Sequence, residues 1–208
     1  MPIRVEIYAS TGVAVGVVAR AGRLREILEA GLDLLIERTV WHPLDGTPPR
    51  AVGPLTLAPD DILIAVADEA DEGPVHAQWH DVRLDIGPYC VTGEMPTMPG
   101  FDPGRALARP TGEFVLLRLA RITLGSAADG AAVAQPTALV NRYVVERVAA
   151  DLMLGFFFPG AAMAFTSGRE RSAAGTPTEA TPLDAPDPAS TVAAAPTAQA
   201  AVGATGEP

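Results

Sequence analysis

The sequence contains no lysine, since all 15 of its basic residues are arginine. Enzymes that form a Schiff base on a lysine and nucleotide-binding proteins that need a phosphate-loop lysine are therefore excluded. There is a single cysteine, Cys90, so no intrachain disulfide can form. Its neighbours Tyr89 and Val91 predict a strand, and a buried, unreactive thiol is expected there rather than a nucleophile.

Aromatic residues and long apolar runs are also scarce. Aromatics make up 5% of the chain, so leucine and β-branched residues must fill any core. No run reaches the ~18 apolar residues of a membrane-spanning helix. Residues 1–6 lack the basic and apolar regions that begin a signal peptide. We therefore expect a cytoplasmic protein, and the lack of disulfides is compatible with a reducing compartment.

The chain is acidic, with a formal net charge of −10. This disfavours nucleic-acid binding, which needs basic residues to replace counterions along the phosphates, and it disfavours adhesion to anionic membranes. The arginines of the second half leave two interpretations open, a local basic patch or scattered surface positions. The arginines considered for such a patch are Arg105, Arg109, Arg118, Arg121, Arg142 and Arg147.

An internal repeat organises the sequence. Three blocks recur in the same order in the two halves, at offsets of 77, 81 and 82 residues, and the offset grows where the second half has a Pro- and Gly-rich insertion. Collinear blocks predict a tandem duplication; the alternative is two unrelated β segments of similar composition. The matches are Val5, Ile7, Val13, Ala14 and Gly16 with Val82, Leu84, Cys90, Val91 and Gly93; Gly31, Leu34, Leu35 and Ile36 with Gly112, Val115, Leu116 and Leu117; and Ile62, Leu63, Val66 and Ala67 with Val144, Val145, Val148 and Ala149.

The repeated unit is predicted to be mainly β with short helices. Alternation and turn residues predict strands over 4–9 and 13–19, a short helix over 23–30 ended by Gly31, a strand over 34–41 and a last strand within 56–67. The second copy is predicted over 81–149, with a helical turn over 102–107 and a long strand over 112–124.

Two small units of this kind predict a pseudo-twofold arrangement. A unit of ~65–75 residues is marginally stable alone, so two β-barrel-like or β-sandwich-like copies are expected to pack face to face. The boundaries are 1–75 for the first β unit, 76–151 for the second, 152–166 for an apolar extension and 167–208 for a tail rich in Ala, Thr and Pro. The tail has too few large apolar residues to offset chain entropy, so we expect it to be disordered.

The apolar extension has no counterpart in the first half, where an acidic stretch, residues 68–72, follows the last strand. Its three consecutive phenylalanines, Phe156, Phe157 and Phe158, cannot all point into one face of a strand or helix. Burying each would contribute roughly 1.5–3 kcal/mol, so full exposure is unfavourable. The segment either folds back over its own domain or, with Phe165, binds a partner or an identical subunit; membrane contact is a third option without a basic flank to support it.

Residues capable of catalysis or metal binding do not form a recognisable set. His76 and His80 have a His-x-x-x-His spacing, but the following Val-Arg-Leu is strand-like, and positions four apart on a strand lie ~13 Å apart. The acidic pairs and runs lack the spacing of a calcium loop. The glycines lack the spacing of a dinucleotide site, so Gly16 and Gly93 are interpreted as backbone positions in paired strands, such as bulges. Trp41 and Trp79 are interpreted as core or interface residues.

The unit and its closing sequence Leu-Val-Asn-Arg-Tyr-Val-Val, residues 139–145, resemble a family of uncharacterised small bacterial β domains. The same sequence is loosely similar to the closing strand of Sm-like barrels. That resemblance implies RNA contacts by basic and aromatic residues. Asp60 and Asp61 stand where the second copy has Arg142 and Tyr143, so no functional residue is carried over.

The function that these patterns favour is a non-enzymatic interaction or scaffold module. It would use no cofactor or metal, and Phe156, Phe157, Phe158 and Phe165 would bind a protein partner or a second copy. The alternative is a ligand-binding protein or enzyme with a site between the repeats, built from Arg142, Tyr143, Asp60 or His80. RNA binding is a third hypothesis and requires a contiguous arginine patch on the second copy.

Overall fold

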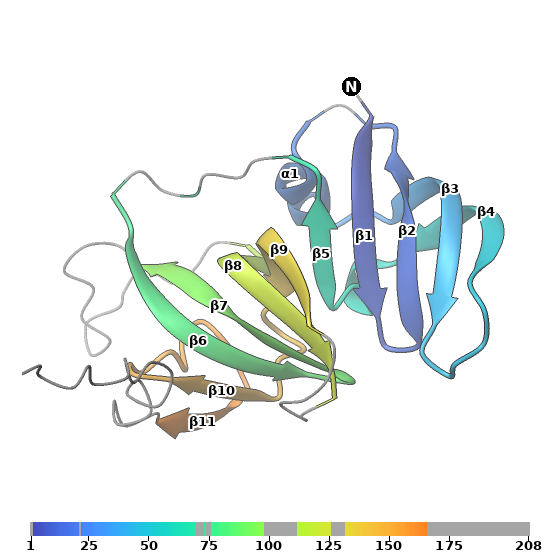
Figure 1. Cartoon of the computed structure of the whole chain (residues 1–208). Coiled ribbons are helices and arrows are strands. Elements are labelled where there is room, and N and C mark those ends of the chain that lie inside the picture. The colour runs from blue at the N-terminus through green and yellow to red at the C-terminus, as the bar shows by residue number, and fades with distance from the viewer. Residues whose placement is uncertain are drawn as a thin grey trace, which may run out of the picture. The chain divides into compact units, whose positions relative to one another are not determined.

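The computed structural model describes residues 2–20, 22–69, 73, 76–97, 112–125 and 132–165. Its strands form one eleven-stranded sheet, which confirms a mainly β chain (Figure 1). The predicted helical turn at 102–107 and the predicted disordered tail at 167–208 lie outside the described residues. No helix in the described part has the length and apolar character needed to cross a membrane.

The first half contributes five strands, one α-helix and one 3₁₀ turn. In chain order these are β1 (Ile3–Ala9), β2 (Gly12–Val18), α1 (Leu24–Glu29), β3 (Leu34–Pro43), β4 (Arg50–Leu57), η1 (Pro59–Asp61) and β5 (Ile64–Ala67).

The second half contributes the remaining strands. These are β6 (Gln78–Ile86), β7 (Tyr89–Thr97), β8 (Phe114–Leu124), β9 (Val133–Asn141), β10 (Arg147–Ala150) and β11 (Ala162–Phe165).

The order of strands in the sheet is β11-β10-β6-β7-β8-β9-β5-β1-β2-β3-β4. The first half therefore has the order β5-β1-β2-β3-β4, and the second half repeats it as β10-β6-β7-β8-β9, with β11 added beyond β10. A shared strand order is what a duplicated unit requires, although an evolutionary duplication stays a prediction. The alignment of the third sequence block was wrong by one residue. Val5 corresponds to Val82, and they pair with Ala67 and Ala150 respectively, so the counterpart of Ala67 is Ala150 and not Ala149.

The two halves join edge to edge, which corrects the predicted face-to-face packing. Strand β5 pairs antiparallel with β9, with Ile64 opposite Val140 and Ala65 opposite Leu139. The backbone N–H of Asn141 also donates to the carbonyl of Leu63. The sheet therefore continues from one half into the other. The sequence could not predict this, because the alternation of apolar residues defines the faces of a strand but not which strand edges pair.

Each half carries a β-bulge at the same place in its second strand pair. Gly16 of β2 faces Arg38 and Thr39, and Gly93 of β7 faces Leu119 and Ala120. Arg38 and Leu119 adopt positive φ angles of 52° and 51°, the left-handed conformation that suits an extra residue in a strand. The prediction that both glycines occupy bulges is confirmed.

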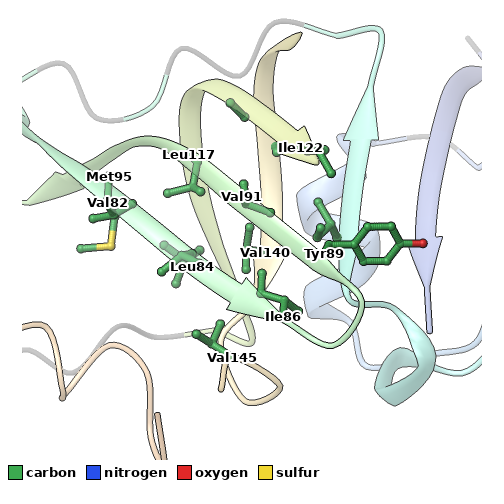
Figure 2. Packing of buried hydrophobic residues seen from close by; sticks show 14 of the residues in the cluster. Val82, Leu84, Ile86, Tyr89, Val91, Met95, Leu117, Ile122, Val140 and Val145 are labelled. Carbon is green, nitrogen blue, oxygen red and sulfur yellow. The ribbon is translucent and has the colours of Figure 1, made fainter. Parts of the chain in front are cut away.

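Two hydrophobic cores lie on opposite faces of this sheet. The first core contains mainly residues of β6–β10, and Figure 2 shows Val82, Leu84, Val91, Leu117 and Val140 converging in it. The second core is built from β1–β3, β5 and α1. Both cores also take residues from the other half, which are Tyr8, Leu63, Ile64 and Val66 in the first core and Phe114, Leu116 and Leu139 in the second.

The long strand β8 separates the two cores. Its residues Val115 and Leu117 face the first core, whereas Phe114 and Leu116 face the second. After the bulge at Leu119 the parity changes, so that Ala120 and Ile122 face the first core. The bulge therefore keeps both ends of an eleven-residue strand directed at the same core.

Helix α1 closes the second core with Leu24, Ile27 and Leu28, which are all buried. Its first turn is capped from a distance, because the backbone N–H of Leu24 donates to the carboxylate of Glu69 at 2.5 Å. A negative charge at this position also suits the positive end of the helix dipole. Glu69 belongs to the acidic stretch 68–72, and nothing in the sequence indicated this capping role.

Candidate functional site

The apolar extension folds back over the first core. Residues 151–161 connect β10 to β11, which pairs parallel with it. Within this connection Leu154 and Phe158 are fully buried, and Phe157 packs against the same core. Phe158 is therefore a core residue, which corrects its assignment as a partner-binding residue. Phe156 and Phe165 remain exposed, so the three consecutive phenylalanines point in different directions, as predicted.

A buried arginine holds two exposed aromatic residues beside this core. Arg142 is 4% exposed, and its guanidinium donates to the carbonyl of Phe156 at 3.1 Å and to that of Gly112 at 3.5 Å. The same guanidinium carbon lies 5.2 Å from the centre of the Tyr143 ring. Tyr143 is 58% exposed and Phe156 is 52% exposed, and we refer to them as the aromatic pair.

The turn that carries Tyr143 is fixed by its neighbours. The side chain of Asn141 accepts a hydrogen bond from the backbone N–H of Tyr143 at 3.0 Å and donates to Glu113 at 3.2 Å. The backbone N–H of Arg142 donates to the carbonyl of Glu113. Arg142 and Tyr143 were proposed as ligand-binding residues, but both terminal nitrogens of the Arg142 guanidinium donate to backbone carbonyls, so the role of Arg142 is to order this surface.

Histidine, threonine and aspartate side chains meet at one end of β6 and β7. The imidazole Nε2 of His80 lies 3.0 Å from the hydroxyl of Thr97, and its Nδ1 lies 3.9 Å from a carboxylate oxygen of Asp151. The order hydroxyl, imidazole, carboxylate is that of a hydrolase relay. However, 3.9 Å is too long for a hydrogen bond, and the Thr97 hydroxyl is buried and also donates to the carbonyl of Gln78. The cluster therefore joins strand ends and does not present a nucleophile.

A polar groove of about 450 Å³ lies where the two halves meet, between β1, β5 and β9. Two of the carboxylates that line it, those of Glu6 and Glu69, are already used within the chain. Glu6 accepts hydrogen bonds from Tyr8 and Gln135, both at 3.1 Å, and Glu69 caps α1. Neither Asp60 nor His80 lines this groove, so the predicted ligand site between the repeats gains no support from the residues proposed for it.

Three ionisable groups inside the sheet, Tyr8, Tyr89 and Cys90, have raised pKa values. Burial raises the pKa of Tyr89 to about 12, and burial together with the nearby Glu6 carboxylate raises the pKa of Tyr8. Burial also raises the pKa of Cys90, which confirms the prediction of a buried and unreactive thiol. Among the described residues, no three His, Cys, Asp or Glu side chains are placed to hold a metal ion together.

The two tryptophans have structural surroundings. The guanidinium of Arg118 lies 3.9 Å from the centre of the Trp79 ring and pairs with Glu94. Trp41 packs against the second core and lies directly over Gly12, where a Cβ atom would be 2.3 Å from the indole ring. The arginine-rich patch required for RNA binding is not supported at Arg118 or Arg142, because both are engaged within the chain.

Sequence reasoning located the aromatic segment but could not place its residues. The signal for Phe156 was only its position in a phenylalanine run, and nothing in the sequence linked it to Arg142, 14 positions earlier. No protein family model, curated protein or solved structure matches the chain. The similarity to Sm-like barrels therefore stays an expectation from a short sequence segment.

Proposed function

We propose that this chain is a non-enzymatic interaction module that binds a protein through the aromatic pair. The observation that carries the proposal is that a buried arginine orders two exposed aromatic residues on a short turn and a loop. An exposed aromatic residue whose backbone is already fixed loses less conformational entropy when a partner covers it. Aromatic residues and arginine are also enriched at the cores of protein interfaces.

Internal packing does not require these two side chains. Arg142 contacts the backbone carbonyl of Phe156, not its ring, and the Tyr143 ring is more than half exposed. The core beneath is already filled by Leu154 and Phe158. Replacing the rings should therefore leave stability within about 0.5 kcal/mol, as is usual for exposed positions.

Deleting residues 152–165 is a poor test, because the deletion would remove two core side chains. A photo-reactive benzophenone amino acid at position 156 of the full chain is better suited. We expect irradiation of cells that naturally make the chain to yield a covalent product with another polypeptide. Position 124 provides the matched control, since Leu124 is also 52% exposed but lies at the end of β8. Equal or no product from both positions would contradict the proposal.

A further inference from the structure

The two edges of the sheet differ in how they are protected. Strand β4 contains Gly53, whose φ is +76°, followed by Pro54, and its pairing with β3 shifts register twice. Such irregularities and prolines keep an edge strand from pairing with another chain. Strand β11, at the other end, has the sequence Ala-Met-Ala-Phe, without charge, proline or glycine.

The backbone of β11 has hydrogen-bonding groups directed outward. The N–H of Ala162 donates to the carbonyl of Glu146 at 2.8 Å, toward β10. Successive residues of a strand direct their backbone groups to alternate sides, so Ala164 shares this direction. Met163 and Phe165 therefore direct their N–H and C=O groups away from the sheet. Within the described residues, β11 ends the strand order, and the Phe165 side chain is 63% exposed.

We propose that β11 pairs antiparallel with β11 of a second copy of this chain across a two-fold axis. The inference goes beyond the proposed function, because it concerns the outer edge of β11 and not the aromatic pair. A two-fold axis places the strand against itself, so any charge on it would meet a like charge. The uncharged sequence of β11 meets this condition.

Symmetry also explains why association would stop at two copies. A head-to-tail contact between β11 of one copy and β4 of the next would leave one strand edge free on every added copy, so the assembly would extend into a filament. The bulged, proline-containing β4 disfavours that contact, whereas the β11–β11 contact pairs the strands that end the sheet of each copy within the described residues. The interface closes on itself.

Charge predicts how association depends on salt. Each copy carries a net charge of −10, so two copies repel each other at low ionic strength. Salt screens that repulsion, while the contact itself contains no ion pair. We expect the dimeric fraction to rise with ionic strength, opposite to an interface held by salt bridges.

Light scattering coupled to size exclusion tests the proposal on the full chain. The wild-type mass should double between low and high protein concentration. Phe165→Lys and Phe165→Glu should each be monomeric, because like charges meet near the axis, and an equimolar mixture of the two should regain the dimer mass. Leu124→Lys, a substitution at another exposed apolar position that lies outside β11, should keep the wild-type mass.

Backbone amide exchange separates strand pairing from any other apolar contact. The amides of Met163 and Phe165 should exchange more slowly in concentrated wild type than in the Phe165→Lys variant. A wild type that stays monomeric at every concentration and salt, or a dimer that survives Phe165→Lys, overturns the inference. If the chain is monomeric while position 156 still forms a covalent product with a different protein, the proposed function stands without it. If both measurements are negative, both fail.

Discussion

Tyr89 connects the two halves at the level of a single side chain. It begins β7, directly after the β6–β7 turn, and its hydroxyl donates to the carbonyl of Ala9 at 2.9 Å. Its ring meets that of Tyr8 edge-on, with centroids 5.4 Å apart. Figure 2 shows the ring reaching from the first core toward the strands of the first half. A hydrogen bond and an aromatic contact thus reinforce the junction that β5 and β9 make through their backbones.

The stability of the fold should depend on the ionisation of Tyr89. Its pKa is raised from 10 to about 12, so the folded state retains the proton more tightly than the unfolded chain. Its contribution is fully present below pH 10 and is lost as pH rises toward 12. Tyr89→Phe should lower the free energy of unfolding by about 1 kcal/mol at neutral pH, because the hydrogen bond to Ala9 is lost. It should also flatten the decline of stability above pH 10.

Urea unfolding of both proteins across neutral and alkaline pH measures this dependence. The variant should still lose some stability in alkali, because the pKa of Tyr8 is raised too. Parallel stability curves for wild type and variant would show that Tyr89 does not contribute in this way.

The burial or direction of a side chain could be predicted only where its sequence neighbours determined it. The burial of Cys90 followed from its apolar neighbours, and the divergence of the phenylalanines followed from strand geometry. The roles of Arg142 and Glu69 could not be predicted from the sequence, because their partners, Phe156 and Leu24, are distant in sequence. A charged residue gives no local signal of whether it will meet water or a backbone group.

At the scale of the element, the two sides of the bulge between β7 and β8 lead to opposite predictions. A Cβ atom on Gly93 would lie 2.9 Å from the backbone oxygen of Arg118, too close for any carbon. Gly93→Ala should therefore cost about 1–3 kcal/mol through overpacking. Leu119 is 65% exposed and has a positive φ, so Leu119→Gly should relieve about 1 kcal/mol of strain while losing few contacts.

Thermal or urea unfolding of the two variants measures both effects. Leu124→Gly is the control for the second, since Leu124 is an exposed leucine of the same strand without a positive φ. It should be destabilised, because glycine disfavours an extended strand. A Leu119→Gly variant as unstable as Leu124→Gly would mean that the bulge stores no strain.

Most strands could be predicted from alternation and turn residues, and the exceptions have local reasons. The strand Arg50–Leu57 was not predicted, because Gly53 and Pro54 interrupt its pattern, as only an edge strand tolerates. The β10 block was displaced by one residue because Val144, Val145 and Val148 resemble the first-half pattern in either alignment. Apolar identity alone does not define a register.

At the scale of the whole molecule, each core needs residues from both halves. The first half alone would expose the core surfaces of Tyr8, Leu63, Ile64 and Val66, and the second half would expose those of Phe114, Leu116 and Leu139. We expect separate fragments 1–75 and 76–208 to lack cooperative unfolding and to recover it when mixed. A full chain cut at an engineered protease site between residues 70 and 75 after folding should stay associated.

Near-ultraviolet circular dichroism and urea unfolding of the fragments test this expectation. A fragment that unfolds cooperatively by itself would show that its half is an independent domain. The sequence predicted that each unit would need the other, from size alone. It could not predict that they share one sheet, because the pairing of β5 with β9 joins residues about 75 positions apart.

The burial of both faces of β8 has a consequence for how this strand finds its place. The four residues 114–117 are all apolar and all buried. Shifting the strand by one position would replace each of them with another apolar residue, so hydrophobicity alone cannot select the register. The register of β8 is then selected by backbone conformation at the bulge. Only one alignment places Leu119, with its positive φ, opposite Gly93, so the absence of a side chain at Gly93 determines the register of β8.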